Sequence, residues 1–151
     1  MEWVTSLKGK VVGLDTSPII YFIERHPLYV DMMRSFFQAV QRDECAVVTS
    51  TMTLLETLVM PFKQGNIDLA HQYRNILFKT RGHTTFWLSP AIAEEAARLR
   101  ASYNIRTPDS IQLATAIFGG ASFFLTNDTR LPSLPNLKTL VLDDLKKDSE
   151  E

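Results

Sequence analysis

Four acidic residues in this sequence could act together on a phosphate ester: Asp15, Glu56, Asp109 and Asp128. They belong to four separate segments, and each stands where a strand is expected to end or a helix to begin. Hard divalent cations such as Mg²⁺ and Mn²⁺ prefer oxygen ligands, and Mg²⁺ commonly takes only one or two carboxylates together with water and substrate phosphate. This set of acids therefore predicts a carboxylate metal site and phosphate-ester chemistry.

Each acid also has a purely structural interpretation when it is taken alone. Asp15 and Asp128 both fit turns, in which an Asp side chain bonds its own backbone. Asp109 stands in the first turn of a helix, where an acid gains roughly 0.3 to 1 kcal/mol from the helix dipole. Glu56 shares its helical column with methionines, so we expect a partly buried carboxylate that needs a cation or a basic partner. The alternative is an exposed glutamate on a narrow polar face.

Other catalytic chemistries have weaker support in the sequence. The three histidines lack the spacing of zinc ligands, and the glycines form no nucleotide-binding fingerprint. Ser17 and Ser110 have no histidine placed near a nucleophile elbow. A haloacid-dehalogenase-like phosphatase would need a second Asp two residues after Asp15, where Ser17 stands. A phospho-accepting receiver module would show paired acids after its first strand and a lysine after a late strand, and this sequence has neither feature.

Hydrophobic periodicity predicts the strands and helices that must position the four acids. We expect strands at 11–15, 45–48, 84–88, 121–125 and 136–142. We expect one helix from a Ser17 cap with Pro18 in its first turn and another from near 27 to 40. Further helices are expected over 52–63, from after Asn66 to about 79, over 90–103 and over 109–118. Such alternation implies a parallel sheet covered on both faces. Ligands bind outside the carboxyl ends of the strands in these sheets, where Asp15 and Asp128 are expected.

Length and composition fit one globular domain, since the 151 residues are 45% hydrophobic and 22% charged. We place this domain at residues 1–145 and expect the charged tail, 146–151, to be disordered. The single cysteine, Cys45, excludes a disulfide framework, favours a reducing compartment and is expected to be a buried core thiol. We see no export signal and no apolar run near the ~20 residues that span a bilayer, so we expect a soluble, cytoplasmic protein.

The formal net charge is −1, but charge is unevenly distributed. Residues 60–107 contain seven Lys or Arg against three Asp or Glu, a basic excess that could steer a polyanion to the acidic centre. Solvated helix faces are the alternative interpretation. Aromatic residues, including Phe86, Trp87, Phe36-Phe37 and Phe123-Phe124, are expected in the core rather than on a base-stacking platform, because they follow strand and helix periodicity.

The motifs around the four acids resemble those of the PIN-domain family, particularly the small VapC-type ribonucleases of prokaryotic toxin–antitoxin systems. Asp15-Thr-Ser is similar to the family's opening Asp-[Ser/Thr]-[Asn/Ser] element, and Thr53-Leu-Leu-Glu56-Thr-Leu resembles its helix-borne glutamate. Thr107-Pro-Asp109-Ser-Ile-Gln-Leu-Ala-Thr-Ala116 is similar to the family's Pro-Asp-x-x-x-x-Ala-x-Ala helix start, and Thr126-Asn-Asp128 to its Thr-x-Asp. The order and spacing of these motifs agree over most of the chain.

The resemblance implies a three-layer α/β/α fold with a central, mainly parallel sheet of four to five strands, and a metal-dependent ribonuclease that hydrolyses RNA phosphodiester bonds. It implies one or two Mg²⁺ or Mn²⁺ ions held among Asp15, Glu56, Asp109 and Asp128. Of these, we expect Asp15 and Asp109 to be direct ligands and Glu56 to act through water or as a base. Asp128 is expected to serve a second metal or the outer shell.

Thr16 and Thr126 are expected to hydrogen-bond these carboxylates and hold them in place. Before a cation binds, neighbouring like charges should raise the pKa of some of the acids. We therefore expect the stability of the protein to depend strongly on metal.

The expected partners are an RNA substrate, a cognate antitoxin and a second copy of the chain, with no membrane. The aromatic residues Tyr21, Phe22, Tyr29 and Phe36 could form a dimer or antitoxin surface, or they could belong to the core. Two alternative functions also stay open. One is a PIN protein that acts in RNA processing rather than as a toxin, and the other is a catalytically silent metal- or RNA-binding module, which would bind metal without turnover.

Overall fold

The computed structural model describes the backbone of residues 1–150 and the side chains of residues 1–148. Five strands, all parallel to their neighbours, form one sheet in the order β3-β2-β1-β4-β5. The strands are β1 (Val11–Leu14), β2 (Ala46–Ser50), β3 (His83–Phe86), β4 (Phe123–Thr126) and β5 (Lys138–Val141). The helices are α1 (Glu2–Thr5), α2 (Thr16–Ile23), α3 (Val30–Gln41), α4 (Thr51–Gln64), α5 (Ile67–Phe78), α6 (Pro90–Ser102), α7 (Thr107–Phe118) and α8 (Leu142–Glu150). The parallel α/β architecture predicted from the sequence is confirmed.

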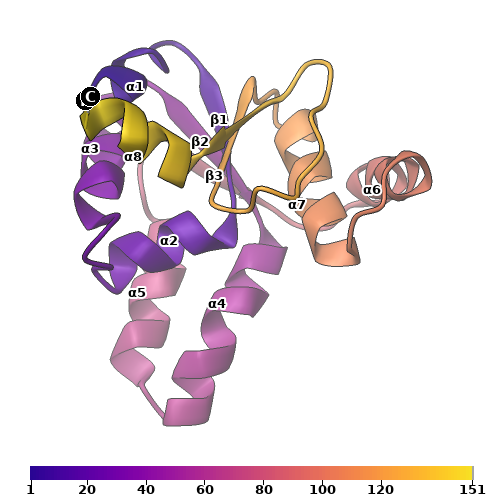
Figure 1. Ribbon diagram of the computed structural model, residues 1–151. Helices are drawn as coiled ribbons and strands as arrows, with labels where there is room; N and C mark the ends of the chain where they lie inside the picture. The colour runs from indigo at the N-terminus through magenta and orange to yellow at the C-terminus, as the bar shows by residue number, and fades with distance from the viewer. Residues whose placement is uncertain (151) are drawn as a thin grey trace.

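Helices cover both faces of this sheet (Figure 1). Val12, Val47 and Leu125 point into a core shared with α1, α2, α3, α5 and α8, whereas Val48 and Phe124 point into a second core shared with α6 and α7. Neighbouring strand residues thus enter opposite cores. This two-sided burial explains why the strands appear in the sequence as continuous apolar runs.

Gly13 allows β1 to lie directly against α7. A Cβ atom added at this glycine would lie 2.5 Å from Cβ of Ala116 and 3.0 Å from Cδ1 of Phe124, so a larger residue would force the two elements apart. The contact holds α7 against the strand that leads into Asp15.

Most helices begin and end at the residues that the sequence marks as caps. Ser50 caps α4, Ser89 caps α6, and Gly65 ends α4 with a φ of 65°. Helix α2 differs from the prediction, because its N-cap is Asp15 and not Ser17. The helix therefore starts immediately after strand β1, before the expected first turn at Pro18.

Three further elements differ from the sequence prediction. The single-turn helix α1 was not predicted; Trp3 and Val4 anchor it in the core. Helix α3 begins at Val30 rather than near Pro27. Residues 142–150 form helix α8, which includes residues 146–150 of the tail that we expected to be disordered. Leu142 and Leu145, three residues apart, pack on the core and account for this helix. The part of the tail prediction that concerns Glu151 lies outside the described residues.

Several predictions about individual core residues can be compared with the structure. Cys45 is buried as expected, and this burial raises the pKa of its thiol to about 11. Tyr29 and Phe36 are also buried, which favours the core interpretation for these two aromatic residues. The core prediction is wrong for Trp87, whose exposed fraction is 66%. Trp87 directly follows β3, an edge strand of the sheet.

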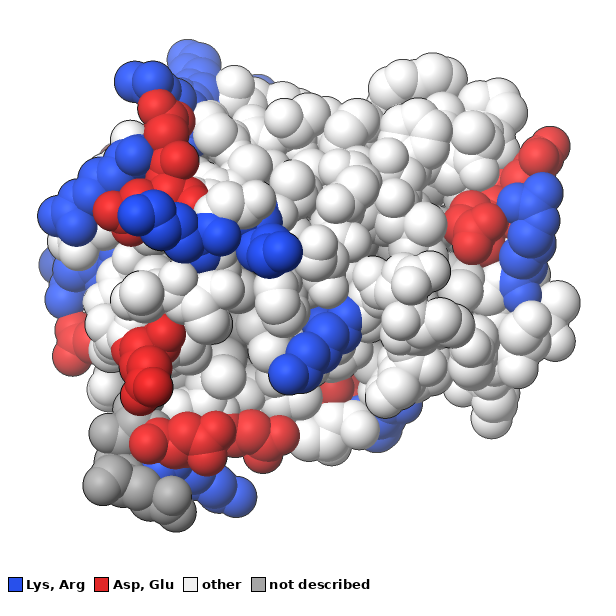
Figure 2. All heavy atoms as spheres, turned by 90° about the horizontal axis from the view of Figure 1, so that it is seen from above, with Lys and Arg blue, Asp and Glu red and all other residues white. Residues whose placement is uncertain are grey.

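Charged side chains of opposite sign lie beside one another on the surface. Three of the seven basic residues counted in the segment 60–107 form ion pairs: Arg81, Arg98 and Arg106. Seen from above the view of Figure 1, charged groups of both signs gather at the left and right of the face, and two separate basic side chains lie nearer its centre among uncharged residues (Figure 2). On this face, the described residues form no continuous basic track. Within residues 1–150, no helix combines the length and apolar character needed to cross a membrane.

Candidate active site

The four predicted acids line a single open cavity of about 530 Å³. Two of them reach it from neighbouring strands, because Asp15 follows β1 and Asp128 lies just past β4, which pairs with β1. Glu56 comes from the second turn of α4 and Asp109 from the first turn of α7. The structure thus brings together all four acids at the carboxyl edge of the sheet, where parallel α/β folds bind ligands.

Asp15 is held by two hydrogen bonds to its two carboxylate oxygens. The backbone N–H of Thr16 donates to Oδ1 at 2.8 Å, and the hydroxyl of Thr126 donates to Oδ2 at 2.7 Å. Burial raises the pKa of Asp15, the two hydrogen bonds oppose this shift, and the charges of Asp109 and Glu56 add to it. The expected like-charge effect is present, but burial is the larger cause.

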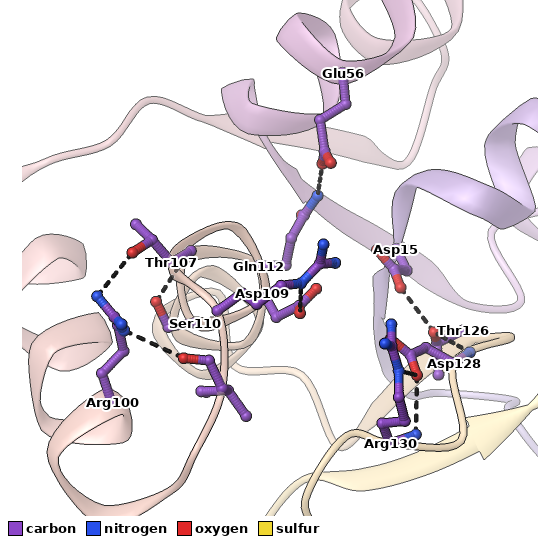
Figure 3. A network of polar contacts seen from close by, with 12 residues as sticks. Asp15, Glu56, Arg100, Thr107, Asp109, Ser110, Gln112, Thr126, Asp128 and Arg130 are labelled. Carbon is purple, nitrogen blue, oxygen red and sulfur yellow. Dashed lines mark hydrogen bonds and ion pairs between the residues drawn. The ribbon is translucent and has the colours of Figure 1, made fainter.

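Glu56 is an exposed residue, so the prediction of partial burial is wrong for it. The reason is that α4 projects from the sheet with this part of its surface towards the open cavity. One carboxylate oxygen nevertheless has protein partners: Oε1 accepts from the hydroxyl of Thr16 at 2.9 Å and from Nε2 of Gln112 at 3.3 Å. Figure 3 shows the Gln112 side chain extending from α7 to Glu56.

Gln112 is the centre of a buried polar network behind the cavity. Its side chain is almost fully buried, and its Nε2 lies 3.0 Å from Oγ1 of Thr16 and 2.8 Å from Oγ1 of Thr53. The Thr53 hydroxyl in turn lies 3.2 Å from Oε1 of Gln112. These contacts connect α2, α4 and α7, the three helices that carry or flank Asp15, Glu56 and Asp109.

Asp109 and Asp128 are each paired with an arginine. Nε of Arg106 lies 3.1 Å from Oδ2 of Asp109. Arg130 binds Asp128 with both sides of its guanidinium, Nε to Oδ1 and Nη2 to Oδ2, each at 3.0 Å (Figure 3). The Arg130 hydrogen bonds lower the pKa of Asp128, more than burial raises it. Asp15 and Asp128 therefore shift in opposite directions within one cavity.

The segment after β4 is fixed by its own hydrogen bonds. The Thr126 hydroxyl, which donates to Asp15, also accepts from the N–H of Asp128 at 3.0 Å. Asn127 accepts from the N–H of Asp143 at 3.0 Å, which ties the segment to the start of α8. Thr126 thus connects two of the four acids directly.

The chemistry of the donor set suits a hard divalent cation, because all four acids offer carboxylate oxygens to the same cavity. Among the residues that the structure describes, however, no three His, Cys, Asp or Glu side chains converge closely enough to hold a metal ion. The contacts above explain this arrangement, since Asp109 and Asp128 face arginines and Glu56 faces Gln112.

Three residues at the site were missed by the sequence analysis. Gln112 could have been recognised as the only amide in the otherwise apolar helix, three residues after Asp109 on the same face. Arg106 and Arg130 stand three residues before Asp109 and two residues after Asp128. Their proximity in sequence to the acids was a signal, but their basic charge suggested solvent exposure or steering of a polyanion rather than pairing.

Comparison with known proteins agrees with the motifs and the fold. The family model described as PIN domain matches residues 12–137 of the chain. No match was found among curated protein sequences. Similar solved structures include VapBC2 from Rickettsia felis bound to a DNA fragment from their promoter, with a TM-score of 0.69 and 18% sequence identity over 87% of this chain and 98% of that one.

Two further similar structures come from toxin–antitoxin systems. DNA-bound VapBC from Salmonella typhimurium has a TM-score of 0.61 and 16% identity, covering 88% of this chain and 98% of that chain. A toxin–antitoxin complex from Klebsiella pneumoniae has a TM-score of 0.59 and 23% identity, covering 84% and 94%. At these identities the likeness establishes a shared fold.

Proposed function

Because the chain belongs to the PIN-domain family, a family of nucleases, we propose that it is a metal-dependent endoribonuclease and acts as a VapC-like toxin. The observation that carries this proposal is the cavity into which four separate segments bring Asp15, Glu56, Asp109 and Asp128. A bound Mg²⁺ or Mn²⁺ would stabilise charge on the scissile phosphate and lower the pKa of an attacking water.

The acids have different roles in this proposal. Asp15 and Asp109 are direct ligands of the cation, and Asp128 serves a second cation or the outer shell. The Thr126 hydroxyl fixes the orientation of Asp15 through its 2.7 Å hydrogen bond. Thr16 connects the two parts of the site, since its N–H binds Asp15 and its hydroxyl binds Glu56.

Glu56 is proposed to accept a proton from the attacking water. Its Oε1 is held by Thr16 and Gln112. For Oε2, the described part of the chain provides no hydrogen-bond donor, so this oxygen is free to accept from water. A carboxylate with one fixed oxygen and one available oxygen is suited to orient a nucleophile.

The proposed protein partners are inferred from the similar structures. The similar structures are VapBC and toxin–antitoxin complexes, which supports a cognate antitoxin as the protein partner of this chain in the cytoplasm. A homodimer is part of the proposal as well. The product of the neighbouring open reading frame is the first candidate for the antitoxin.

The test is cleavage of a pool of structured and single-stranded RNAs in Mg²⁺, Mn²⁺ or EDTA by the wild type, Asp15→Asn and Asp109→Asn. We expect cleavage only with metal and a loss of about 100-fold or more in either variant, since the cation contributes several kcal/mol and each 1.36 kcal/mol is tenfold in rate. Asparagine is also a good N-cap, so Asp15→Asn should preserve α2.

The matched control is Asp31→Asn, which removes an exposed acid that pairs with Arg34 on α3, outside the cavity. It should cleave like the wild type, and circular dichroism should show all variants folded. A wild-type protein that binds Mn²⁺ but cuts no RNA would overturn the nuclease proposal and favour the catalytically silent metal- or RNA-binding module.

A further inference from the structure

Two arginines share the proposed metal cavity with the acids. Arg106 and Arg130 both line it, and each forms an ion pair with one of the acids, Asp109 or Asp128. The other two acids, Asp15 and Glu56, are held by uncharged hydroxyl, amide and backbone donors. The cavity therefore contains two acids whose charge is locally neutralised and two whose charge is not.

From this arrangement we infer that Arg106 and Arg130 are exchangeable counter-ions: they compete with the divalent cation for Asp109 and Asp128, and once displaced they bind the RNA phosphates. The inference rests on the proposed function, and it adds a substrate-binding role for two residues outside the four acids. A guanidinium on a carboxylate repels a metal ion that binds the same carboxylate, and in the Asp128 pair both oxygens already accept from Arg130.

Relative burial shows which partner of each pair can move. The side chains of Asp109 and Asp128 have exposed fractions of 16% and 21%, whereas those of Arg106 and Arg130 have 67% and 77%. The two acids are thus largely covered by the protein, whereas the two arginines are largely open to solvent. Exposed arginine pairs of this kind are weak and are readily broken, so the arginines rather than the acids are expected to leave.

The displaced arginines are chemically suited to the substrate. The planar guanidinium binds phosphate oxygens in a bidentate manner, as Arg130 already binds both oxygens of Asp128. Both side chains line the cavity that a phosphodiester must enter to reach the four acids. Each cation bound would thus make a cationic group available for the polyanion.

The first measurement is Mn²⁺ affinity by isothermal titration calorimetry for the wild type, Arg106→Gln, Arg130→Gln and the double variant. We expect each substitution to tighten Mn²⁺ binding by about 2- to 5-fold, the range for an exposed ion pair. The control is Arg98→Gln, which removes an arginine paired with Glu94 and Glu95 on α6, away from the cavity. This control should bind Mn²⁺ like the wild type.

The second measurement is the affinity of the same proteins for a fluorescent 2′-O-methyl oligoribonucleotide in Mn²⁺, by anisotropy over a range of salt concentrations. Each cavity variant should bind more weakly, and the slope of log K against log salt should fall by about 0.7 per arginine. Tighter Mn²⁺ binding together with weaker oligonucleotide binding supports the inference.

Unchanged or weaker Mn²⁺ binding in both variants would overturn the exchange, and so would an unchanged oligonucleotide affinity. If the wild type itself binds no Mn²⁺, the proposed metal-dependent function fails and the inference fails with it. If the wild type binds Mn²⁺ and cleaves RNA but the variants match it, only the inference fails. Circular dichroism of the variants should be that of the wild type, because both arginine side chains are mainly exposed.

Discussion

The two halves of the acidic cavity are stabilised by different kinds of donor. In the half formed by β1, α2 and α4, the carboxylates of Asp15 and Glu56 accept hydrogen bonds from Thr126, Thr16 and Gln112. These donors are buried and carry no net charge. They fix the positions of the carboxylates, but they leave the negative charge in place.

In the other half, the partners of Asp109 and Asp128 are the exposed cations Arg106 and Arg130. These partners cancel negative charge, but long exposed side chains do not hold a fixed geometry. The pKa shifts reflect the difference, since the pKa of Asp15 is raised by burial and that of Asp128 is lowered by Arg130. In the half with Asp15 and Glu56, the neutral half, uncharged donors hold the carboxylates in place but leave their negative charge uncompensated. In the half with Asp109 and Asp128, the arginine half, Arg106 and Arg130 compensate the negative charge and are able to move away.

Gln112→Leu should disrupt the hydrogen bonds of the neutral half and lower the stability more than the substitutions at Asp15 and Asp128 change it. It removes the amide that contacts Thr16, Thr53 and Glu56, and it leaves the buried Thr53 hydroxyl with only a 3.4 Å contact to Thr16. Loss of partners for a buried polar group costs about 1–3 kcal/mol. For a domain of this size that lowers the Tm by roughly 2–12 °C, measured by thermal unfolding.

RNA cleavage by this variant separates a positioning role from a purely structural one. We expect kcat to fall by about tenfold, the effect of about 1.4 kcal/mol, because Glu56 loses one of its two donors. The control is Thr115→Val, since the Thr115 hydroxyl is equally buried but bonds only the Ile111 carbonyl of its own helix. A similar fall in kcat for both variants would contradict the positioning role of Gln112.

The sequence predicted the parts of this molecule that depend on local pattern. The apolar runs and caps were sufficient to predict the parallel α/β arrangement and most of its helices. The positions of Asp15 and Asp128 after strands were sufficient to predict that both lie at one edge of the sheet. The four acids could be grouped because two of them, Asp15 and Asp128, follow strands whose direction is fixed by the topology.

The contacts between the acids and their partners could not be predicted in the same way. Gln112 lies 56 residues from Glu56, and their contact depends on how α7 packs beside α4. The exposure of Glu56 depends on the projection of α4 beyond the sheet, and periodicity alone gave the wrong answer there. Likewise, helix α8 forms because Leu142 packs into the core, and the charged residues beside it in the sequence give no indication of this packing.

Asp15→Asn should stabilise the protein at neutral pH in EDTA. The pKa of Asp15 in the folded state is raised above its ordinary value of 3.8, so between these two values the folded state binds more protons than the unfolded state. The stability that this residue contributes is therefore full below pH 3.8 and is lost as the pH rises through the folded pKa. Above it, the variant should have the higher Tm.

The measurement is the Tm of the wild type and of Asp15→Asn in EDTA between pH 4 and pH 8. The Tm of the variant should exceed that of the wild type by an amount that grows with pH and then levels off. Added Mn²⁺ should reverse the order, because a cation at about 100 times its dissociation constant stabilises the wild type by about 2.7 kcal/mol, or roughly 5–10 °C. A variant that is less stable than the wild type in EDTA at pH 8 would show that the charge of Asp15 is already compensated.

Asp128→Asn should have the smallest effect on stability in EDTA, and with the opposite sign. The pKa of Asp128 is lowered by Arg130, so its contribution to stability is present above pH 3.8 and is lost as the pH falls through the folded pKa. The amide oxygen of asparagine can still accept from the backbone N–H of Arg130, so the loss is the charge interaction and one of the two guanidinium hydrogen bonds. We expect a Tm lower by roughly 1–3 °C at pH 7, a difference that about 1 M NaCl should largely remove by screening. If Asp15→Asn and Asp128→Asn shifted the Tm in the same direction, the two halves of the cavity would not differ in charge balance, and the arginines would not be the counter-ions that distinguish them.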